Sequence, residues 1–435
     1  MNRNYVLTIC RTLISRCLRA LACPFYLLAV FVSALFVGFS KQPASKRLVW
    51  GSVPIINNSH WSRAMRAAGF NSVTYTDGYY QINDRGDWDL ILSEQYSWLP
   101  VTIRPYVAFL VAIFKYDIFF ISIDGFFIGR GSLWWIQSPI LKLAKKKVVV
   151  IPYGGDAFIY RRVRSPSVVH GLLSSYPLAA RQQAAISRRV DYWVARADFV
   201  IPANMGCDGF GRWDVLIHLC LFLGLDDWKP SVRSNFSNGI DGVVVIAHTP
   251  NHRGFKGTEF VISAVKKLQE EGLKVELLLF EGVSNEKVRG ALQSDVDILV
   301  EQLIFTGHAL SSLEGMASAL PVISNLEDGA SLEVFRRYSY FKECPLISAS
   351  PENIADVLRV LVLSPKLREE LGRAGRKYVE RYHSTSVAQK LFADIVSYLS
   401  GDRGSLINYF DPLKGEFRAE GEAVVSPLVN NRLPD

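Results

Sequence analysis

The first 76 residues contain no Asp or Glu, although the 435-residue chain has 41 acidic residues in all. Nine Lys and Arg residues precede Asp77, and without them the chain would carry 40 basic against 41 acidic side chains. The net charge of +8 is therefore a property of the N-terminus. It does not indicate a general nucleic-acid-binding surface, and we expect no nucleic-acid partner.

Cysteine is also scarce. The six cysteines form no C-x-x-C pair and have no histidine at the spacing of zinc ligands. This pattern predicts reduced thiols in a cytosolic compartment and no metal site. Neither a GxGxxG nor a P-loop pattern occurs, which argues against a site for a dinucleotide or a nucleoside triphosphate.

One long apolar run is present, from Ala20 to Phe39, and it contains no charged residue. A helix of this length would measure about 30 Å, enough to cross the hydrocarbon core of a bilayer. Basic residues flank the run on both sides and can meet anionic headgroups, but they give no clear orientation. The sequence is compatible with a helix that spans the membrane and with a helix that lies in the membrane surface. The length of the run disfavours a cleaved signal peptide. We expect residues 1–45 to be a membrane segment, with the rest of the protein on the cytosolic side of the cytoplasmic membrane.

From residue 46 the sequence alternates apolar strands with helical stretches. The expected strands of the first half are 48–53, 116–123, 147–152 and 198–201. This alternation predicts a doubly wound parallel sheet, in which ligands bind beyond the carboxyl ends of the strands. A polar stretch near 226–242, with Pro and Gly, then separates this half from a second one.

Four polar residues follow strands of the first half and are candidates for contact with a ligand: Ser52, Asn57, Asp124 and Asp156. Ser52 and Asn57 offer hydrogen-bonding groups, although Asn57 also fits an N-cap cluster for the next helix. Asp124 and Asp156 are suited to contact a ligand hydroxyl. The alternative for both is a turn residue that caps backbone amides.

The second half opens with a buried apolar run, 243–247, followed by a basic loop and a helical stretch, 259–268. The loop carries Arg253, Lys256 and Gly257. An arginine fork, a mobile ammonium and free amides in such a loop are suited to hold a phosphate. The alternative is a solvated basic turn.

A short helix that runs into a buried strand follows about sixty residues later, in the stretch 311–324. The amides of Ser311, Ser312 and Leu313 and the helix dipole are again suited to a diphosphate. Glu314 in the first turn can accept hydrogen bonds from ribose hydroxyls. The competing interpretation is a capping box from Ser311 to Glu314, in which the glutamate binds no ligand.

Together these elements resemble the donor-binding domain of family 4 glycosyltransferases, which have the GT-B architecture. The resemblance covers about residues 241–400 and is carried by the basic loop and by the strands 275–280 and 297–302. The run Leu313-Glu-Gly-Met-Ala-Ser-Ala-Leu-Pro-Val-Ile323 resembles the L-E-A-M-A-x-G-x-P-V-I signature of that family. It implies that Arg253 and Lys256 hold the donor diphosphate and that Glu314 holds the nucleotide ribose.

The chain departs from the family pattern where a first glutamate usually contacts the transferred sugar. Thr306 stands eight residues before Glu314, so the nucleotide half of the donor site is expected to be intact and the sugar half altered. Thr306 and His308 are candidates to hold the sugar, and with Asp156 they are the catalytic candidates. The candidates on the side of the acceptor are Ser52, Asn57 and Asp124. No general base stands out.

The resemblance implies two Rossmann-like domains that face a cleft, with boundaries that we place as follows: membrane segment 1–45, acceptor-side domain 46–235, donor-binding domain 236–384, a terminal helix 385–400 that crosses back, and a flexible tail 401–435. It also implies retaining, metal-independent transfer from a nucleotide-diphosphate sugar to a lipid-linked or saccharide acceptor, without a cofactor. Such a role fits polysaccharide or glycolipid assembly in bacteria. A non-catalytic nucleotide-sugar-binding subunit and a sugar-nucleotide epimerase are the alternatives.

Overall fold

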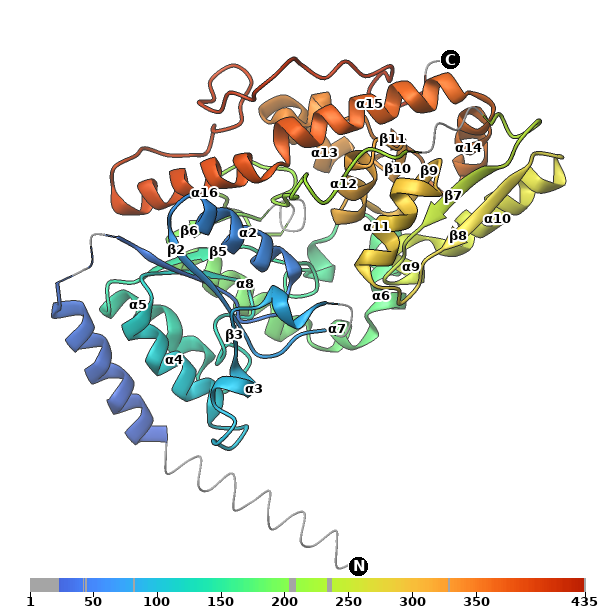
Figure 1. Cartoon of the computed structure of the whole chain (residues 1–435). Helices are drawn as coiled ribbons and strands as arrows, with labels where there is room; N and C mark the ends of the chain where they lie inside the picture. The colour runs from blue at the N-terminus through green and yellow to red at the C-terminus, as the bar shows by residue number, and fades with distance from the viewer. Residues whose placement is uncertain are drawn as a thin grey trace, which may run out of the picture.

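The computed structural model describes residues 23–41, 43, 45–80, 83–202, 209–232, 237–327 and 329–433. Two parallel sheets, each flanked by helices, build the body of the protein (Figure 1). The six-stranded sheet has the order β3-β2-β1-β4-β5-β6 and the five-stranded sheet has the order β11-β10-β9-β7-β8. In each sheet, later strands are added on both sides of the first strand, which is β1 in one sheet and β7 in the other, as in a doubly wound fold.

The first sheet comprises β1 (Arg47–Trp50), β2 (Asn71–Thr76), β3 (Leu90–Ile91), β4 (Ile118–Ile121), β5 (Lys147–Val150) and β6 (Phe199–Val200). Its helices are α2 (Ile56–Ala67), α3 (Leu92–Gln95), α4 (Arg104–Lys115), α5 (Gln137–Leu143), α6 (Pro166–Ser175), α7 (Pro177–Arg181) and α8 (Gln183–Arg196), with short 3-10 turns η1 (Arg85–Asp87), η2 (Trp134–Ile136) and η3 (Tyr160–Arg162). Strand β4 is buried along its whole length because helices cover both faces of the sheet.

The second sheet comprises β7 (Val244–His248), β8 (Val275–Leu279), β9 (Ile298–Thr306), β10 (Val322–Asn325) and β11 (Ile347–Ser348). Its helices are α9 (Arg253–Lys256), α10 (Thr258–Glu270), α11 (Asn285–Ser294), α12 (Leu310–Ala317), α13 (Gly329–Tyr338), α14 (Ile354–Leu363), α15 (Pro365–Tyr382) and α16 (Thr385–Ser400), with the 3-10 turn η5 (Tyr340–Glu343). The register between β9 and β10 shifts twice, so the end of β9 is irregular.

Helix α16 leaves the second half and lies on α2 of the first (Figure 1). The Phe392 ring contacts Trp50 at 4.9 Å and Phe120 at 5.7 Å between centroids. Trp50 and Phe120 themselves stack at 3.7 Å across neighbouring strands. The last helix of the chain therefore completes the core of the first sheet.

Residues 401–433 form no named helix or strand, yet they pack on the body of the protein. Tyr409 and Phe410 are buried, and the amide of Asn431 donates to the carbonyl groups of Cys344 and Leu346. These contacts differ from the flexible tail that we expected, because the sequence pattern of this stretch gives no sign of them.

The apolar run at the N-terminus is described from residue 23 onward, and residues 23–39 are helical. Residues 20–22 of the expected membrane segment lie outside the described part of the chain. Among the described residues, no helix has both the length and the apolar character needed to cross a membrane.

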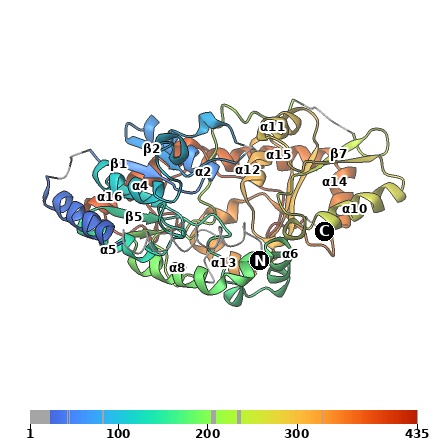
Figure 2. The ribbon, with the colours of Figure 1, turned by 90° about the horizontal axis from the view of Figure 1, so that it is seen from below.

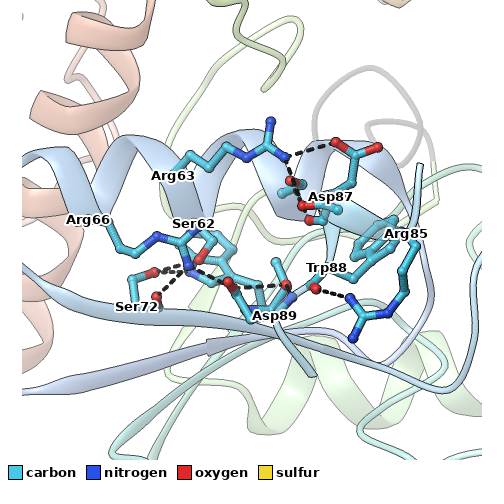
Figure 3. A network of polar contacts seen from close by, with 12 residues as sticks. Ser62, Arg63, Arg66, Ser72, Arg85, Asp87, Trp88 and Asp89 are labelled. Carbon is cyan, nitrogen blue, oxygen red and sulfur yellow. Dashed lines mark hydrogen bonds and ion pairs between the residues drawn. The ribbon is translucent and has the colours of Figure 1, made fainter. Parts of the chain in front are cut away.

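A polar network fastens α2 to the sheet and to the loop before β3 (Figure 3). Arg63 pairs with Asp87 at 2.8 Å, and Arg66 pairs with Asp89 at 2.7 Å. Asp89 also accepts the backbone amide of Thr74. The loop that runs from the end of β2 to β3 is therefore anchored at its far end.

Helix α2 begins earlier than expected, which changes the role of Asn57. The N-cap is Ile55 and makes no side-chain cap, so the polar run 57–59 lies inside the first turns. Asn58 donates to the Val53 carbonyl and Ser59 donates to the Asp87 carbonyl. The interpretation of this run as an N-cap cluster is wrong.

Candidate functional site

The basic loop after β7 is itself a single helical turn, α9, which ends at Gly257. Gly257 has φ of 75°, a left-handed conformation that favours glycine, and the next helix starts directly after it. A Cβ at this position would also lie only 3.0 Å from the Leu303 side chain. Gly257 thus serves the tight reversal between α9 and α10.

Arg253 lies on the outer side of this turn. Its guanidinium pairs with Glu259 and with Glu281, both at 2.8 Å, and all three side chains are partly exposed. These two carboxylates raise the pKa of Arg253 further above its ordinary value through hydrogen bonds and charge. In this state Arg253 is therefore neutralised by protein carboxylates at the surface.

Lys256 points the other way, into the protein. Its ammonium donates to Gln302 at 2.8 Å and to Glu301 at 3.2 Å. The Lys256 side chain is 7% exposed and that of Glu301 is 0% exposed. The two cations expected to share one phosphate thus contact different partners, one outside and one inside.

Glu301 is the centre of a buried cluster at the N-terminus of α12. Besides Lys256, its carboxylate accepts the amide of Ala309 at 2.9 Å, the hydroxyl of Ser311 at 3.0 Å and the hydroxyl of Ser312. Burial alone would raise the pKa of Glu301, but Lys256, His308 and these hydrogen bonds outweigh it, so the pKa is lowered. Lys256, Ser311 and Ser312, three of the residues expected to meet a diphosphate, therefore hold an internal carboxylate, and the two serines do so through their hydroxyls.

Glu301 was not among the residues singled out from the sequence. The signal was the acidic and amide pair at 301–302 inside the otherwise apolar run 298–305, since a charge in a buried strand needs a partner. Its partners are distant in sequence, and only the fold brings them together.

Glu314 does not form the capping box. The N-cap of α12 is Ala309, without a side-chain cap, and Glu314 lies beyond the first turn. Its carboxylate instead accepts the side-chain amide of Asn285 at 2.9 Å. Burial and the charge of Glu301 raise the pKa of Glu314 to about 7, against the lowering effect of Asn285. The competing interpretation as a capping box is therefore wrong. Glu314 is a buried carboxyl group whose pKa lies near neutral pH.

Thr306 and His308 follow at the end of β9. Thr306 pairs with Asn325 across the sheet, and His308 is buried against His218, whose ring stacks at 4.8 Å between centroids. Burial lowers the pKa of His308 to about 4, so its ring is neutral at pH 7. His308 thus belongs to a packed interior contact as well as to the surroundings of Glu301.

A pocket of about 350 Å³ lies at the carboxyl ends of β1, β2 and β4 in the first sheet. Its lining includes Ser52 and Asp124, two of the expected acceptor-side residues. It also includes Asp77, Tyr79, Tyr80 and Arg130, which the sequence analysis did not select. The signal for Asp77 was an Asp-Gly pair directly after a stretch with Val, Thr and Tyr that favours a strand, a pattern common to many turns.

Asp124 is held tightly within this pocket. Arg130 and the Tyr153 hydroxyl donate to one carboxylate oxygen, and Arg189 lies 3.5 Å from the other. The Ser52 hydroxyl accepts the amide of Phe127 and so orders the same loop. Ser52 and Asp124 are brought together here, whereas Asn57 lies in the first turn of α2 and is not part of the lining.

Asp156 has a backbone role. Its carboxylate accepts the amides of Ile123, Tyr153 and Gly154 at 2.9–3.1 Å. Burial and nearby Asp124 raise its pKa to about 7 against these hydrogen bonds. The alternative of a turn-capping aspartate is the one that the geometry supports, and it positions the loops beside the pocket.

Helix α6 of the first half packs directly on α9 of the second. The Ser175 hydroxyl accepts the amide of Phe255 at 2.9 Å, and a Cβ at Gly171 would lie 2.8 Å from Ile304. An aromatic cluster of Phe158, Phe255 and Phe305 surrounds the contact. The basic turn is therefore covered by the first domain in this structure.

Comparison with known proteins identifies the fold. No protein-family model and no curated protein matches the chain. A solved structure of Anabaena HepE in complex with UDP-glucose matches with a TM-score of 0.50 and 12% identity, over 81% of this chain and 99% of that chain.

Two further structures match similarly. Anabaena HepE in complex with UDP matches with a TM-score of 0.52 and 11% identity, over 81% of this chain and 100% of that chain. Sucrose-phosphate synthase from Thermosynechococcus elongatus matches with a TM-score of 0.52 and 12% identity, over 83% of this chain and 100% of that chain. At such identities the likeness speaks for the fold alone: the chain has the two Rossmann-like domains of the GT-B architecture.

Proposed function

We propose that this protein is a glycosyltransferase that moves a sugar from a nucleotide-diphosphate donor to a lipid-linked or saccharide acceptor. In keeping with the resemblance to family 4, we infer a retaining reaction without a metal or other cofactor. The setting is the cytosolic face of the cytoplasmic membrane, in polysaccharide or glycolipid assembly. The GT-B fold and the ligands of the matched HepE structures, UDP-glucose and UDP, support this proposal.

The observation that carries the proposal is that several hydrogen-bond donors meet at one carboxylate, at the N-terminus of α12. Lys256, the Ala309 amide and the hydroxyls of Ser311 and Ser312 all contact the Glu301 carboxylate. The same set of a cation, an amide and hydroxyls stabilises the charge that develops on a departing diphosphate. A donor diphosphate would therefore compete with the Glu301 carboxylate for these groups.

The other donor contacts are placed around this point. Glu314 would accept hydrogen bonds from the ribose, and the amides from Ser311 to Leu313 would face the diphosphate. Arg253 and Gly257 belong to the same turn as Lys256, and Arg253 would exchange its surface carboxylates for phosphate oxygens. Thr306 and His308 are left for the sugar.

A second function is favoured by the same cluster: a subunit that binds a nucleotide sugar but does not transfer it. Thr306 stands where the family usually has a glutamate, and Lys256 and the Ala309 amide contact the Glu301 carboxylate instead of being free for a phosphate. Binding without turnover, together with a need for a partner transferase, would distinguish this function.

The proposal is tested by donor binding and turnover with purified protein, without added metal, across UDP-, GDP- and ADP-sugars. A CMP-sugar serves as the matched control because it has a single phosphate. We expect one of the diphosphate donors to bind, to be hydrolysed slowly, and to be used faster when membrane lipid extract supplies an acceptor. If none of the diphosphate sugars binds, the assignment of the α12 site is wrong.

We infer that the pocket of the first domain receives the acceptor, since its carboxylates can accept hydrogen bonds from sugar hydroxyls and its tyrosines can pack on a sugar ring. Asp77 is the test residue because the arginines around Asp124 tie that carboxylate into the fold. We expect Asp77→Asn to lower kcat/KM for the acceptor about tenfold, the equivalent of one charge-assisted hydrogen bond. Donor affinity and the kinetics of the exposed control Asp402→Asn should stay as in the wild type. An unchanged kcat/KM in Asp77→Asn would place the acceptor elsewhere.

A further inference from the structure

The helix at residues 23–39 has two apolar faces on opposite sides. One face is buried: Val30 and Ala34 are 0% exposed and Val37 is 7% exposed. The other carries exposed large side chains at i, i+3 and i+4 spacing, which are Phe25, Leu28, Val32, Phe36 and Phe39, between 53% and 86% exposed. A surface helix of a soluble domain would place polar residues on this second face.

The buried face fastens the helix lengthwise to the first domain. Near its start, the Tyr26 ring packs edge-on against Tyr106 of α4 at 5.0 Å, and its hydroxyl donates to the Tyr106 carbonyl. Near its end, Gly38 lies so close to α5 that a Cβ would be 2.3 Å from the Leu143 carbonyl oxygen. Figures 1 and 2 both show the helix at the outer edge of the molecule, beside α4 and α5.

A second exposed apolar segment precedes α4, the helix on which residues 23–39 pack. The loop 96–103 leads into α4 close to Tyr106, and it exposes Trp98, Val101 and Ile103 at 76%, 71% and 45%. Tryptophan with aliphatic neighbours at an exposed loop is typical of the boundary between lipid headgroups and acyl chains. The helix and this loop together are named the apolar face below.

The segments that form the apolar face and its support carry only basic charged residues. These segments, residues 23–47, 96–116 and 131–147, contain no Asp or Glu. Exposed Lys41 follows the helix, and exposed Lys142 and Lys145 lie at the end of α5 against which Gly38 packs. Four arginines also precede the helix in the sequence, at positions 3, 11, 16 and 19.

We propose that the apolar face docks on an anionic lipid bilayer, with the helix at 23–39 lying in the membrane surface. The face that packs on α4 and α5 stays with the domain, while the phenylalanine face enters the boundary between headgroups and acyl chains. The lysines at the rim then meet lipid phosphates. This inference deepens the membrane part of the proposed function and rests on it for its purpose, but its physical evidence is independent of the donor site.

The test is flotation of the full-length protein with vesicles of phosphatidylcholine alone or with phosphatidylglycerol. We expect the wild type to bind the mixed vesicles, and to bind more weakly without phosphatidylglycerol or at high salt. The variant F25Q/L28Q/F36Q removes three exposed apolar side chains and keeps helix-forming residues. Each loses roughly a fivefold contribution to partitioning, so its vesicle affinity should fall about a hundredfold.

The matched control is V232Q/L413Q/V425Q, which changes three side chains that are 82–90% exposed elsewhere on the surface. It should bind vesicles as the wild type does. Circular dichroism and donor binding in solution check that both variants are folded. If neither the wild type nor the variants bind a nucleotide-sugar donor, that result counts against the proposed function and not against membrane docking. Vesicle binding by F25Q/L28Q/F36Q at the wild-type level would overturn the docking proposal. The proposal would also be overturned if the wild type did not bind vesicles and formed a dimer, while F25Q/L28Q/F36Q was a monomer. The apolar face would then be covered by a second copy of the chain.

Discussion

Replacing Lys256 by methionine is expected to lower the free energy of unfolding by about 3–5 kcal/mol. The reason is Glu301, whose carboxylate is fully buried and would lose its only cationic contact at hydrogen-bond distance among the described residues. A buried charge without a counter-charge costs far more than an exposed one. Urea denaturation of wild type and variant, extrapolated linearly to water, measures the difference.

Arg253→Met is the matched control because Arg253 sits in the same turn but pairs at the surface, and its stability should hardly change. The double variant K256M/E301M removes both charges and should regain most of the loss. Equal stability of Lys256→Met and Arg253→Met would show that the buried pair is not formed. The lowered pKa of Glu301 adds a pH signature: its contribution is present above its ordinary value of 4.5 and is lost as the pH falls through the lowered value.

This expectation affects how donor binding should be probed. Loss of nucleotide affinity in a Lys256 variant does not separate a missing contact with the nucleotide from a destabilised fold. Glu314 is the cleaner position, because its carboxylate has a neutral partner in Asn285 and its neutral form is already well populated near pH 7.

Glu314→Gln is expected to weaken the binding of the donor nucleoside diphosphate about a hundredfold. Two ribose hydroxyls donating to a carboxylate contribute roughly 1.5 kcal/mol each, and the amide of glutamine replaces only part of this. The pH dependence is diagnostic: burial and Glu301 raise the pKa of Glu314 to about 7, and the ionised form is the better acceptor. Wild-type affinity should therefore rise from pH 6 to pH 8, and that of Glu314→Gln should not.

Titration calorimetry at several pH values measures both effects. Asn285→Ala provides a second control, since the loss of its hydrogen bond shifts the pKa of Glu314 upward and should move the rise in affinity to higher pH. A Glu314→Gln variant that binds nucleotide as tightly as the wild type would remove Glu314 from the donor site.

Most strands and their parallel arrangement could be predicted because they are short apolar runs between polar turns, as in 147–150 and 244–248. The strands β2, β3 and β11 were not predicted, since β2 is rich in polar residues and the other two have only two residues each. The order of the basic loop and the helix at 310–317 also led to the correct fold. The pairing of Lys256 with Glu301 could not be predicted, since 45 residues separate them and either could have faced solvent. The same holds for α6, whose contact with α9 depends on how two separately built domains meet.

The position of α16 has a consequence for synthesis of the protein on the ribosome. Trp50 and Phe120 are made early, but Phe392, which packs on both rings, emerges about 270 residues after Phe120. At about 5–20 residues per second, the first sheet waits for tens of seconds with this part of its core uncovered. The domain translated first is thus completed last, and a nascent chain that pauses between the two halves exposes an aromatic surface to chaperones.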